Sequence, residues 1–468
     1  MTAPDLSRPQ DLSIAQAGAA LRSGALTSVA LTEAALDRVA LWEDEVHAFI
    51  TLTADRALDR ARRADAERAA GIDLGPLHGI PYGVKDIYDT AGLRTTCGSA
   101  LLTGNVPETD SHVAARLAAA GGVLLGKLNT YEFAMGDRFE DVPFPPALNP
   151  WKLDRVTPGS SSGSGVAIAT GMLRLATGSD TGGSIRLPAA CCGTVGLKPT
   201  FGRVSRRGVY AFSDTCDHTG LLTADIADMA IGMGLISGHD PLDPASADVP
   251  VPDFTAPLDH GIAGLKIGID RRYVEGPGLG QVMWAEFDRV TDLLRALGAE
   301  IVEVRLPDAR DFGACAAAII GTDGLSTHAQ RLRRHPGPET LNLRRYFLPA
   351  LGISALDYLE AQKLRAHLRA GVDAVLGQVD AILCVTTDGG AVPADPLPDM
   401  TRFGRTGAFN LTGHPALSLP TGLDPEGMPL SVQLAGRAFD EPMLLRIGRA
   451  LETATGWLGT RPAHPPRP

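Results

Sequence analysis

Helical and extended hydrophobic patterns alternate along most of this 468-residue chain. Segments whose apolar residues recur with the spacing of one helix face are residues 28–40, 54–70, 111–120, 280–297 and 355–376. Short apolar runs typical of buried strands are residues 79–85, 123–126, 265–270 and 381–385. Ser28 is the expected N-cap of the first helix, and Gly71 is the expected stop of the second. The alternation predicts an α/β fold in which helices cover a β-sheet.

A tract of glycine and serine at residues 157–165 precedes a second Gly-rich run that contains Ser184. Gly182 and Gly183 let the backbone bend before Ser184, so that successive NH groups can face one cavity, as an oxyanion hole requires. A flexible linker is the alternative for such a tract. However, the tract runs directly into the apolar segment 166–173, and a linker is not expected to lead into a buried helix without a break.

Two other catalytic patterns overlap these runs. Ser161 is the centre of a G-x-S-x-G match, but that nucleophile elbow needs an apolar strand before it, and residues 151–158 are not one. Asp180 begins an Asp-Thr-Gly triplet like that of aspartic proteases, whose chemistry needs two carboxylates that share a proton. No second triplet of that form occurs in the chain.

A serine nucleophile needs a base, and none of the 11 histidines lies in residues 157–200. Lysine is therefore the better candidate. Lys85 ends the strand-like run 79–85, and burial there would disfavour the charged amine and leave a neutral base near pH 7. From Lys85 alone, the alternative is a lysine whose side chain extends to solvent.

These motifs together resemble the amidase signature family, the Ser-cisSer-Lys amidohydrolases. Residues 157–171 and 178–203 are similar to its signature, and Gly83-Val84-Lys85-Asp86 is similar to its lysine motif. Lys85 lies 75 positions before Ser160, which lies 24 before Ser184, as in that family. Further matching segments are residues 129–136, 149–151, 217–220, 225–228, 409–420 and 433–437. The resemblance thus covers nearly the whole chain except about 240–380.

The resemblance implies a catalytic triad in which Ser184 is the nucleophile, Ser160 is the bridging serine after a cis peptide bond, and Lys85 is the base. Backbone NH groups would form the oxyanion hole, and the residues that supply them are Thr181, Gly182, Gly183 and Ser184 itself. Asp180 and Arg186 are expected to pair and to order this loop.

The fold implied by the resemblance is a large twisted mixed β-sheet covered on both faces by α-helices. One amidase domain would span residues 1–468. Its expected parts are an N-terminal helical segment (about 1–75), a catalytic core (76–235), a motif-poor helical insert (240–380), C-terminal strands and a helix (381–461), and a tail (462–468).

The implied function is hydrolysis of a small-molecule amide, aryl amide, urea or carbamate. The alternative is a glutamine-hydrolysing amidase subunit of a tRNA-dependent amidotransferase, which releases ammonia for a partner. Asp217-His218-Thr219-Gly220 looks more like the general amidases, which favours the first function. A catalytically silent scaffold is disfavoured because all three triad residues are present.

The resemblance also implies substrate contacts near the segment from Met135 to Asn149, because relatives usually have small polar residues there and this chain does not. The expected contact residues are Ala134, Met135, Phe139 and Phe144. An ordinary exposed loop is the alternative here. Residues 387–390 and 401–403 are weaker candidates for the mouth of the site.

The amino-acid composition argues against several classes of binding partner. With 43 Lys and Arg against 54 Asp and Glu, the net charge is −11, so neither nucleic acid nor an anionic membrane is an expected partner. The six cysteines have no C-x-x-C spacing and the histidines no H-E-x-x-H spacing, so we expect no metal and no cofactor. Reduced thiols and the lack of a long apolar segment favour a cytoplasmic protein. Homodimers are common among relatives, so a homodimer is possible here.

Overall fold

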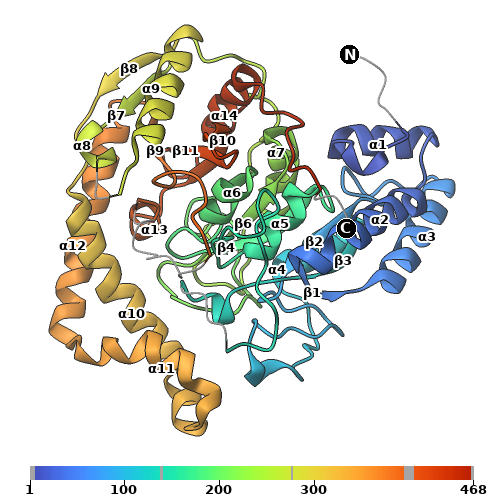
Figure 1. Ribbon diagram of the computed structural model, residues 1–468, viewed down its shortest axis with the longest axis horizontal. Helices are drawn as coiled ribbons and strands as arrows, with labels where there is room; N and C mark the ends of the chain where they lie inside the picture. The colour runs from blue at the N-terminus through green and yellow to red at the C-terminus, as the bar shows by residue number, and fades with distance from the viewer. Residues whose placement is uncertain (1–5, 137–140, 276–277, 395–404, 465–468) are drawn as a thin grey trace.

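The computed structural model describes residues 6–136, 141–275, 278–394 and 405–464 (Figure 1). Within them, eleven strands form one mixed sheet in the order β1-β3-β2-β4-β6-β5-β10-β11-β9-β7-β8. The strands are β1 (Phe49–Leu52), β2 (Pro81–Lys85), β3 (Val123–Leu128), β4 (Leu175–Asp180), β5 (Val195–Lys198), β6 (His218–Thr223), β7 (Lys266–Ile269), β8 (Glu300–Glu303), β9 (Ala381–Val385), β10 (Ala416–Leu423) and β11 (Pro429–Ala435). β2 is parallel to β3 and β4, whereas β4 is antiparallel to β6.

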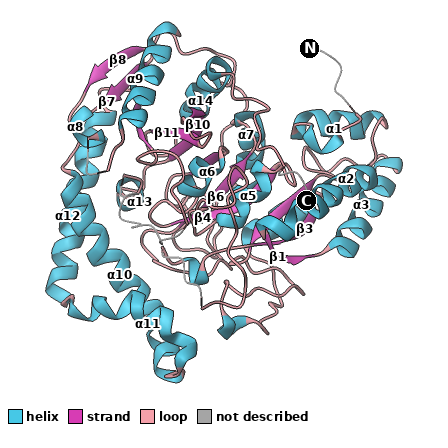
Figure 2. Ribbon diagram, viewed as in Figure 1, coloured by secondary structure: helices cyan, strands magenta, loops and turns pink. Residues whose placement is uncertain are grey.

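Helices surround this sheet, as Figure 2 shows. They are α1 (Ile14–Ser23), α2 (Ser28–Val46), α3 (Ala54–Ala69), α4 (His112–Ala119), α5 (Ser162–Ala169), α6 (Arg186–Cys192), α7 (Ile226–Ile236), α8 (Arg271–Val274), α9 (Gln281–Ala296), α10 (Ala309–Arg334), α11 (Leu341–Phe347), α12 (Ala355–Leu376), α13 (Ala408–Leu411) and α14 (Glu441–Thr455). None of the described helices is both long and apolar enough to cross a membrane.

Both faces of the central strands are buried. Successive residues of a strand point to opposite faces, and here they enter two different hydrophobic cores: Leu175 and Leu221 join one, whereas Ala176 and Leu222 join the other. Helices α1, α7 and α14 contribute to the first core, and α2, α3 and α5 to the second. The expected fold, a mixed sheet covered on both faces by helices, is therefore confirmed.

Most of the predicted elements lie within a few residues of the observed ones, and α12 and β9 have the predicted bounds. The predicted N-cap Ser28 is wrong. Thr27 caps α2 by accepting a hydrogen bond from the NH of Ala30, while the buried hydroxyl of Ser28 donates to Gly79 O at 2.7 Å. The Ser28 hydroxyl is therefore used in a hydrogen bond to a residue distant in the chain, and it does not cap the helix as the local sequence predicts.

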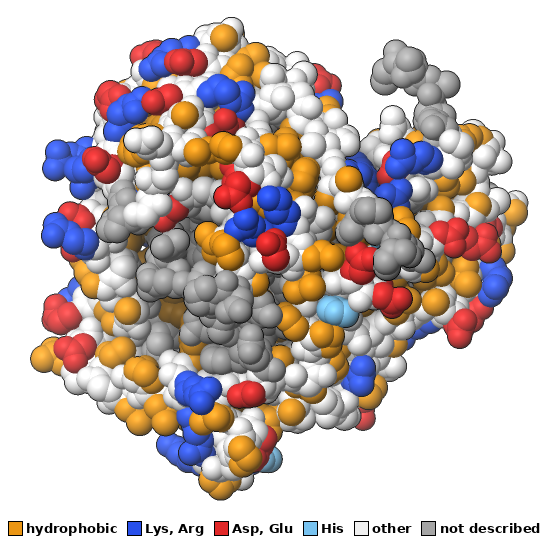
Figure 3. Space-filling model, viewed as in Figure 1, with side chains coloured by type: hydrophobic (Ala, Val, Ile, Leu, Met, Phe, Trp, Pro, Cys, Tyr) orange, Lys and Arg blue, Asp and Glu red, His pale blue; other side chains and the backbone are white. Residues whose placement is uncertain are grey.

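The segment expected to be a motif-poor helical insert also extends the sheet. β7 pairs in parallel with β8 and β9 at one edge. Helices α10, α11 and α12 follow, and they project from the body of the molecule (Figure 1). On the face shown in Figure 3, acidic and basic side chains are interspersed rather than gathered by sign.

Candidate functional site

The site begins where β2 ends, at Lys85. This side chain is fully buried, and its Nζ donates hydrogen bonds to Ser160 Oγ at 2.7 Å and Ser179 Oγ at 2.9 Å. The backbone NH of Lys85 donates to Thr177 Oγ1 on β4, which fixes the end of β2 against its neighbour. The amine is therefore held between two hydroxyls and away from water.

Burial is also what sets the charge of Lys85. It lowers the pKa of the amine to about 7, because the charged form loses its hydration, while the negative charges of Asp180 and Asp217 act in the opposite direction. A large part of this lysine is consequently neutral near pH 7, as a base must be.

Ser160 follows a cis peptide bond between Gly159 and Ser160. Tyr131 holds this turn from two sides: its NH donates to Ser160 O at 3.1 Å, and its hydroxyl donates to Thr157 O at 2.8 Å. A Cβ at Gly159 would lie 2.5 Å from the Tyr131 ring, so only glycine allows this close approach. α5 begins two residues later, at Ser162, inside the tract that the sequence predicts to lead into a helix.

Ser184 lies in the loop that connects β4 to α6. Gly183 has a φ of +142°, and a Cβ there would lie 2.4 Å from Thr406 Oγ1. The Ser161 NH donates to Ser184 O at 3.2 Å, which joins the loop to the Gly/Ser tract. Ser184 itself is half-buried. The structure thus brings the predicted nucleophile and the tract that carries Ser160 into direct contact.

Four NH groups of this loop have no partner among the described residues. Hydrogen bonds from the backbone begin again only at Ile185 and Arg186, whose NH groups donate to Asp180 Oδ2 at 3.1 and 3.4 Å. The free NH groups are those predicted for the oxyanion hole, on Thr181, Gly182, Gly183 and Ser184. Donors left unpaired in a folded loop can be used by a bound anion.

Asp180 and Arg186 pair as expected, entirely buried. Arg186 donates from Nε and Nη2 to the two carboxylate oxygens at 3.0 and 2.9 Å. Burial opposes ionisation of Asp180, but the Arg186 charge outweighs it and holds the pKa of Asp180 below its ordinary value. Because this carboxylate is paired with an arginine rather than with a second carboxylate, the aspartic protease interpretation is wrong.

Ser161 is also accounted for as a structural residue. It is fully buried, and its Oγ donates to Ser179 O and accepts from Ser179 N, both at 3.3 Å. The residues directly before it, 151–158, form turns and isolated bridges rather than the strand that a nucleophile elbow requires.

Several residues of this site had no role assigned from the sequence. Ser179 binds Lys85, Asp217 accepts a hydrogen bond from the Thr181 hydroxyl at 2.5 Å, and Asn410 joins the Asp180–Arg186 pair. Asp217 and Asn410 lie in segments that match family motifs, and this match was the only feature of the sequence that could have pointed to them. Their partners are far away in the chain, so the sequence did not indicate what they contact.

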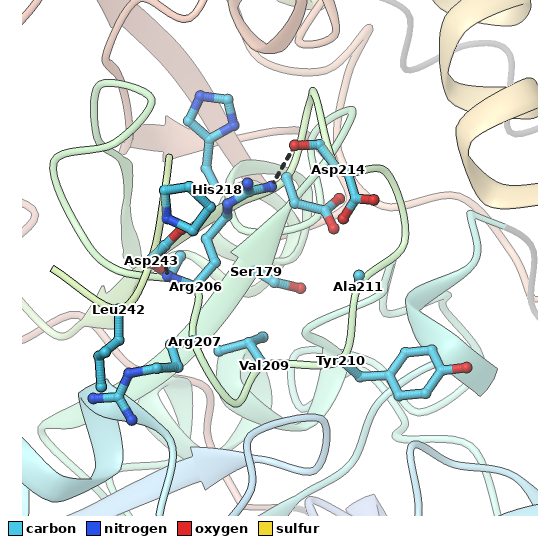
Figure 4. A pocket seen from close by; sticks show the side chains of 13 residues that line it. Ser179, Arg206, Arg207, Val209, Tyr210, Ala211, Asp214, His218, Leu242 and Asp243 are labelled. Carbon is cyan, nitrogen blue, oxygen red and sulfur yellow. Dashed lines mark hydrogen bonds between the residues drawn. The ribbon is translucent and has the colours of Figure 1, made fainter. Parts of the chain in front are cut away.

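A pocket of about 300 Å³ opens beside Ser179 (Figure 4). Asp217, His218 and Arg206 also line it, and Arg206 donates to Asp214 O at 2.7 Å, the bond drawn in the figure. Burial raises the pKa of Asp217 to about 6. The pocket therefore reaches residues that contact both Lys85 and the loop of Ser184.

The predicted substrate contacts are distributed differently. Ala134 and Met135 are buried in the first hydrophobic core. Phe144 is half-buried, lies under the Arg94 guanidinium, and lines a small separate pocket with Tyr131. Phe139 and residues 401–403 lie outside the described residues. These substrate contacts stay predictions.

The six cysteines are buried and unpaired. In the part of the chain that the structure describes, no three His, Cys, Asp or Glu side chains are grouped so as to hold a metal ion.

Comparison with known proteins agrees with this geometry. The family model described as Amidase matches residues 30–445. A glutamyl-tRNA(Gln) amidotransferase subunit from Roseiflexus castenholzii is 41% identical, over 95% of this chain and 96% of that protein.

Solved structures extend the likeness to the whole fold. A chain from an inhibitor-bound vestigial protein complex, related to the origins of an s-triazine catabolic enzyme, has 33% identity and a TM-score of 0.89, covering 96% of this chain and all of the other. The peptide amidase of Stenotrophomonas maltophilia has 31% identity and a TM-score of 0.86, over 97% and 99% of the two chains. This chain therefore belongs to the amidase signature family of hydrolases that act on amides.

Proposed function

We propose that this chain cleaves the carbonyl C–N bond of a small-molecule amide through an acyl-enzyme on Ser184. The observation that carries the proposal is the contact of Lys85 Nζ with Ser160 Oγ, 2.7 Å apart in a buried setting where burial brings the pKa of the lysine to about 7. An amine poised in this way can exchange a proton with a hydroxyl at neutral pH.

In the proposed first step, Lys85 takes the Ser160 proton while Ser160 takes that of Ser184. The Ser184 oxygen then attacks the substrate carbonyl carbon. The resulting tetrahedral oxyanion accepts hydrogen bonds from the free NH groups of residues 181–184. Loss of one such donor typically costs about 100- to 1000-fold in rate.

Collapse of the tetrahedral intermediate breaks the C–N bond. Lys85 returns its proton through Ser160 to the departing nitrogen, which leaves as ammonia or an amine. Water then attacks the Ser184 ester by the same proton route and releases the carboxylic acid. Every proton that leaves a serine is thus returned within one cycle.

Two settings for this chemistry have different support. The relatives at about 40% identity are named as amidotransferase subunits, which supports a glutamine-hydrolysing subunit that supplies ammonia to a partner. The likeness to the peptide amidase supports a free-standing hydrolase of amides, ureas or carbamates. Sequence identity therefore favours the glutamine-hydrolysing subunit over the free-standing hydrolase.

The test is turnover by the purified chain. Glutamine, aliphatic amides, anilides and carbamates would be assayed for released ammonia or amine, with Ser184→Ala as the inactive control and Ser237→Ala as a matched buried serine. Turnover by the chain alone that is lost only in Ser184→Ala supports the free-standing hydrolase. Glutamine turnover that requires a co-purified protein supports the subunit.

A covalent probe gives an independent readout of the nucleophile. A fluorophosphonate should modify Ser184, as located by mass spectrometry, and not Ser160 or Ser161. Absence of both turnover and labelling, alone and with partner proteins, would overturn the proposed function.

A further inference from the structure

Asp217 occupies a defined place beside the catalytic loop. In the antiparallel pairing of β4 with β6, the last pair joins Asp180 to His218. Thr181 and Asp217 are the next residues on the two chains, and the Thr181 hydroxyl donates to Asp217 Oδ1 at 2.5 Å. This side-chain contact continues the ladder at the point where the backbone of the loop leaves the sheet.

The carboxylate of Asp217 is itself rigidly oriented. Its Oδ2 accepts hydrogen bonds from the NH groups of Phe212 and Ser213, at 2.7 and 3.0 Å. The residue is only 9% exposed. A carboxylate with three donors from two segments has little freedom to move, so it can fix the position of what it binds.

Thr181 is the first of the four residues with free NH groups. Its side chain is anchored to Asp217, while the other end of the loop is anchored by the Asp180 carboxylate, which binds the NH groups of Ile185 and Arg186. Two carboxylates thus hold the two ends of one short loop, and only one of them belongs to the expected Asp180–Arg186 pair.

We propose that Asp217 is a positioning residue of the hydrolytic site: it holds Thr181 so that the loop NH groups stay directed at the substrate oxygen, and it places a negative charge near Lys85. This inference rests on the proposed function. Asp217 contacts no reacting atom. It acts through its hydrogen bond with Thr181 and through the electrostatic effect of its negative charge on Lys85.

Two carboxylates act on the charge of Lys85. Asp180 at the end of β4 and Asp217 before β6 favour the protonated amine, against the effect of burial. Burial raises the pKa of the nearby Cys97 thiol well above its ordinary value, so this thiol carries no charge near pH 7. Ser160 and Ser179 supply its hydrogen-bond partners. Around Asp217, burial raises the pKa to about 6, while the hydrogen bonds from Thr181, Phe212 and Ser213 and the charge of Arg206 favour ionisation. The carboxylate is therefore ionised above about pH 6 and then opposes the neutral form of Lys85.

The contact can be tested from both of its ends. Thr181→Val removes the hydroxyl and keeps the shape, whereas Thr181→Ser keeps the hydroxyl. Asp217→Asn keeps the size and removes the charge. Asp323→Asn is the matched control, because Asp323 binds Ser213 and Thr215 of the same loop rather than Thr181.

The expected result is a fall in kcat of about tenfold or more for Thr181→Val and Asp217→Asn, with KM changed less than about threefold, since a small misplacement of a catalytic group costs up to about 100-fold. Thr181→Ser should restore most of the rate, and Asp323→Asn should stay within about threefold of the wild type. The double variant should be no worse than the slower single variant, because both substitutions act on the same contact between residues 181 and 217.

A second readout separates positioning from simple loss of structure. Removing the charge of Asp217 should lower the pKa of Lys85, so the acid limb of kcat/KM should move to lower pH in Asp217→Asn but not in Thr181→Val. A rate for Thr181→Val above half of the wild-type rate, or effects that multiply in the double variant, would overturn the inference while leaving the proposed function intact. A wild-type chain that neither turns over nor labels would instead remove both.

Discussion

Lys85 Nζ lies 2.7 Å from Ser160 Oγ, although 75 positions separate the two residues in the chain. The contact forms because β2 and β4 are neighbours in the sheet and Ser161, the residue after Ser160, is hydrogen-bonded to Ser179 on β4. Lys85 thereby exchanges solvent for two hydroxyls, and this burial is what makes the amine a base at neutral pH.

Removing the amine should stop turnover without unfolding the chain. Lys85→Ala is expected to lower kcat at least about 100-fold, because general-base catalysis is typically worth about 100- to 10,000-fold. Steady-state kinetics and circular dichroism would measure rate and folding together. Lys127→Ala is the matched control: Lys127 is equally buried and donates to Thr95 Oγ1 at 2.7 Å, away from the serines. Retention of more than about a tenth of kcat in Lys85→Ala would exclude this base.

The rate should depend on pH through the same group. The pKa of about 7 for Lys85 means that kcat/KM should rise about tenfold per pH unit below 7 and level off above it, because only the neutral amine accepts a proton. A pH profile from about 5 to 9 with substrate below KM would measure this. A rate that falls as pH rises through 7 would contradict a lysine base.

Stability should depend on pH in the same direction. The pKa of Lys85 falls from its ordinary value of 10.5 to about 7 in the folded chain, so between these values the unfolded chain binds a proton that the folded chain does not. The free energy of unfolding of the wild type, relative to Lys85→Met, should therefore rise by about 1.4 kcal/mol per pH unit. Urea unfolding of both proteins at about pH 7.5 and 9.5 would test it. Parallel stability curves would show that Lys85 is not buried as described.

The Asp180–Arg186 pair should be essential for stability. Arg186 also donates to Thr406 O, Gln433 Oε1 and Asn410 Oδ1 at 2.9, 3.0 and 2.7 Å, a set that one ammonium cannot reproduce. Arg186→Lys should lower the free energy of unfolding by about 3 kcal/mol or more, since breaking a buried pair costs about 3–5 kcal/mol.

The control for this prediction is an exposed arginine pair. Arg62 pairs with Asp59 on α3, where the two side chains are 62% and 76% exposed. Arg62→Lys should change the free energy of unfolding by less than about 0.5 kcal/mol. Equal effects at the two positions, measured by urea unfolding, would mean that the buried network does not hold the loop.

Gly183 should tolerate no side chain. Its φ of +142° disfavours any other residue, and a Cβ would also lie 2.9 Å from the Leu187 side chain. Gly183→Ala should lower kcat about 100-fold or more, because the loop must shift and displace the NH donors beside Ser184. Gly104→Ala, where a Cβ meets open space, should leave kcat within about twofold. Kinetics on the two variants would decide, and full activity of Gly183→Ala would contradict the assigned loop geometry.

The elements that hydrophobic periodicity predicted were mostly placed correctly, because periodicity depends on neighbours in the chain. The periodicity of residues 355–376 and 381–385 predicted α12 and β9 with the bounds that the structure has. α10 was not predicted, because its buried residues are few and widely spaced over 26 positions. β8 was missed because it is an edge strand without a fully buried residue.

The sequence by itself determined which residue types are available for chemistry: a lysine at the end of a strand, serines among glycines, and no histidine near them. Only the tertiary structure decided which of these groups meet. In the folded chain the Ser28 hydroxyl binds Gly79 O and does not cap its helix. Ser161 has a structural role. Ser179 contacts Lys85, and Asp217 contacts Thr181. The physical reason is that hydrophobic periodicity is a local property, whereas the pKa of Lys85 and the direction of the loop NH groups depend on burial and on hydrogen-bond partners that only the folded sheet supplies.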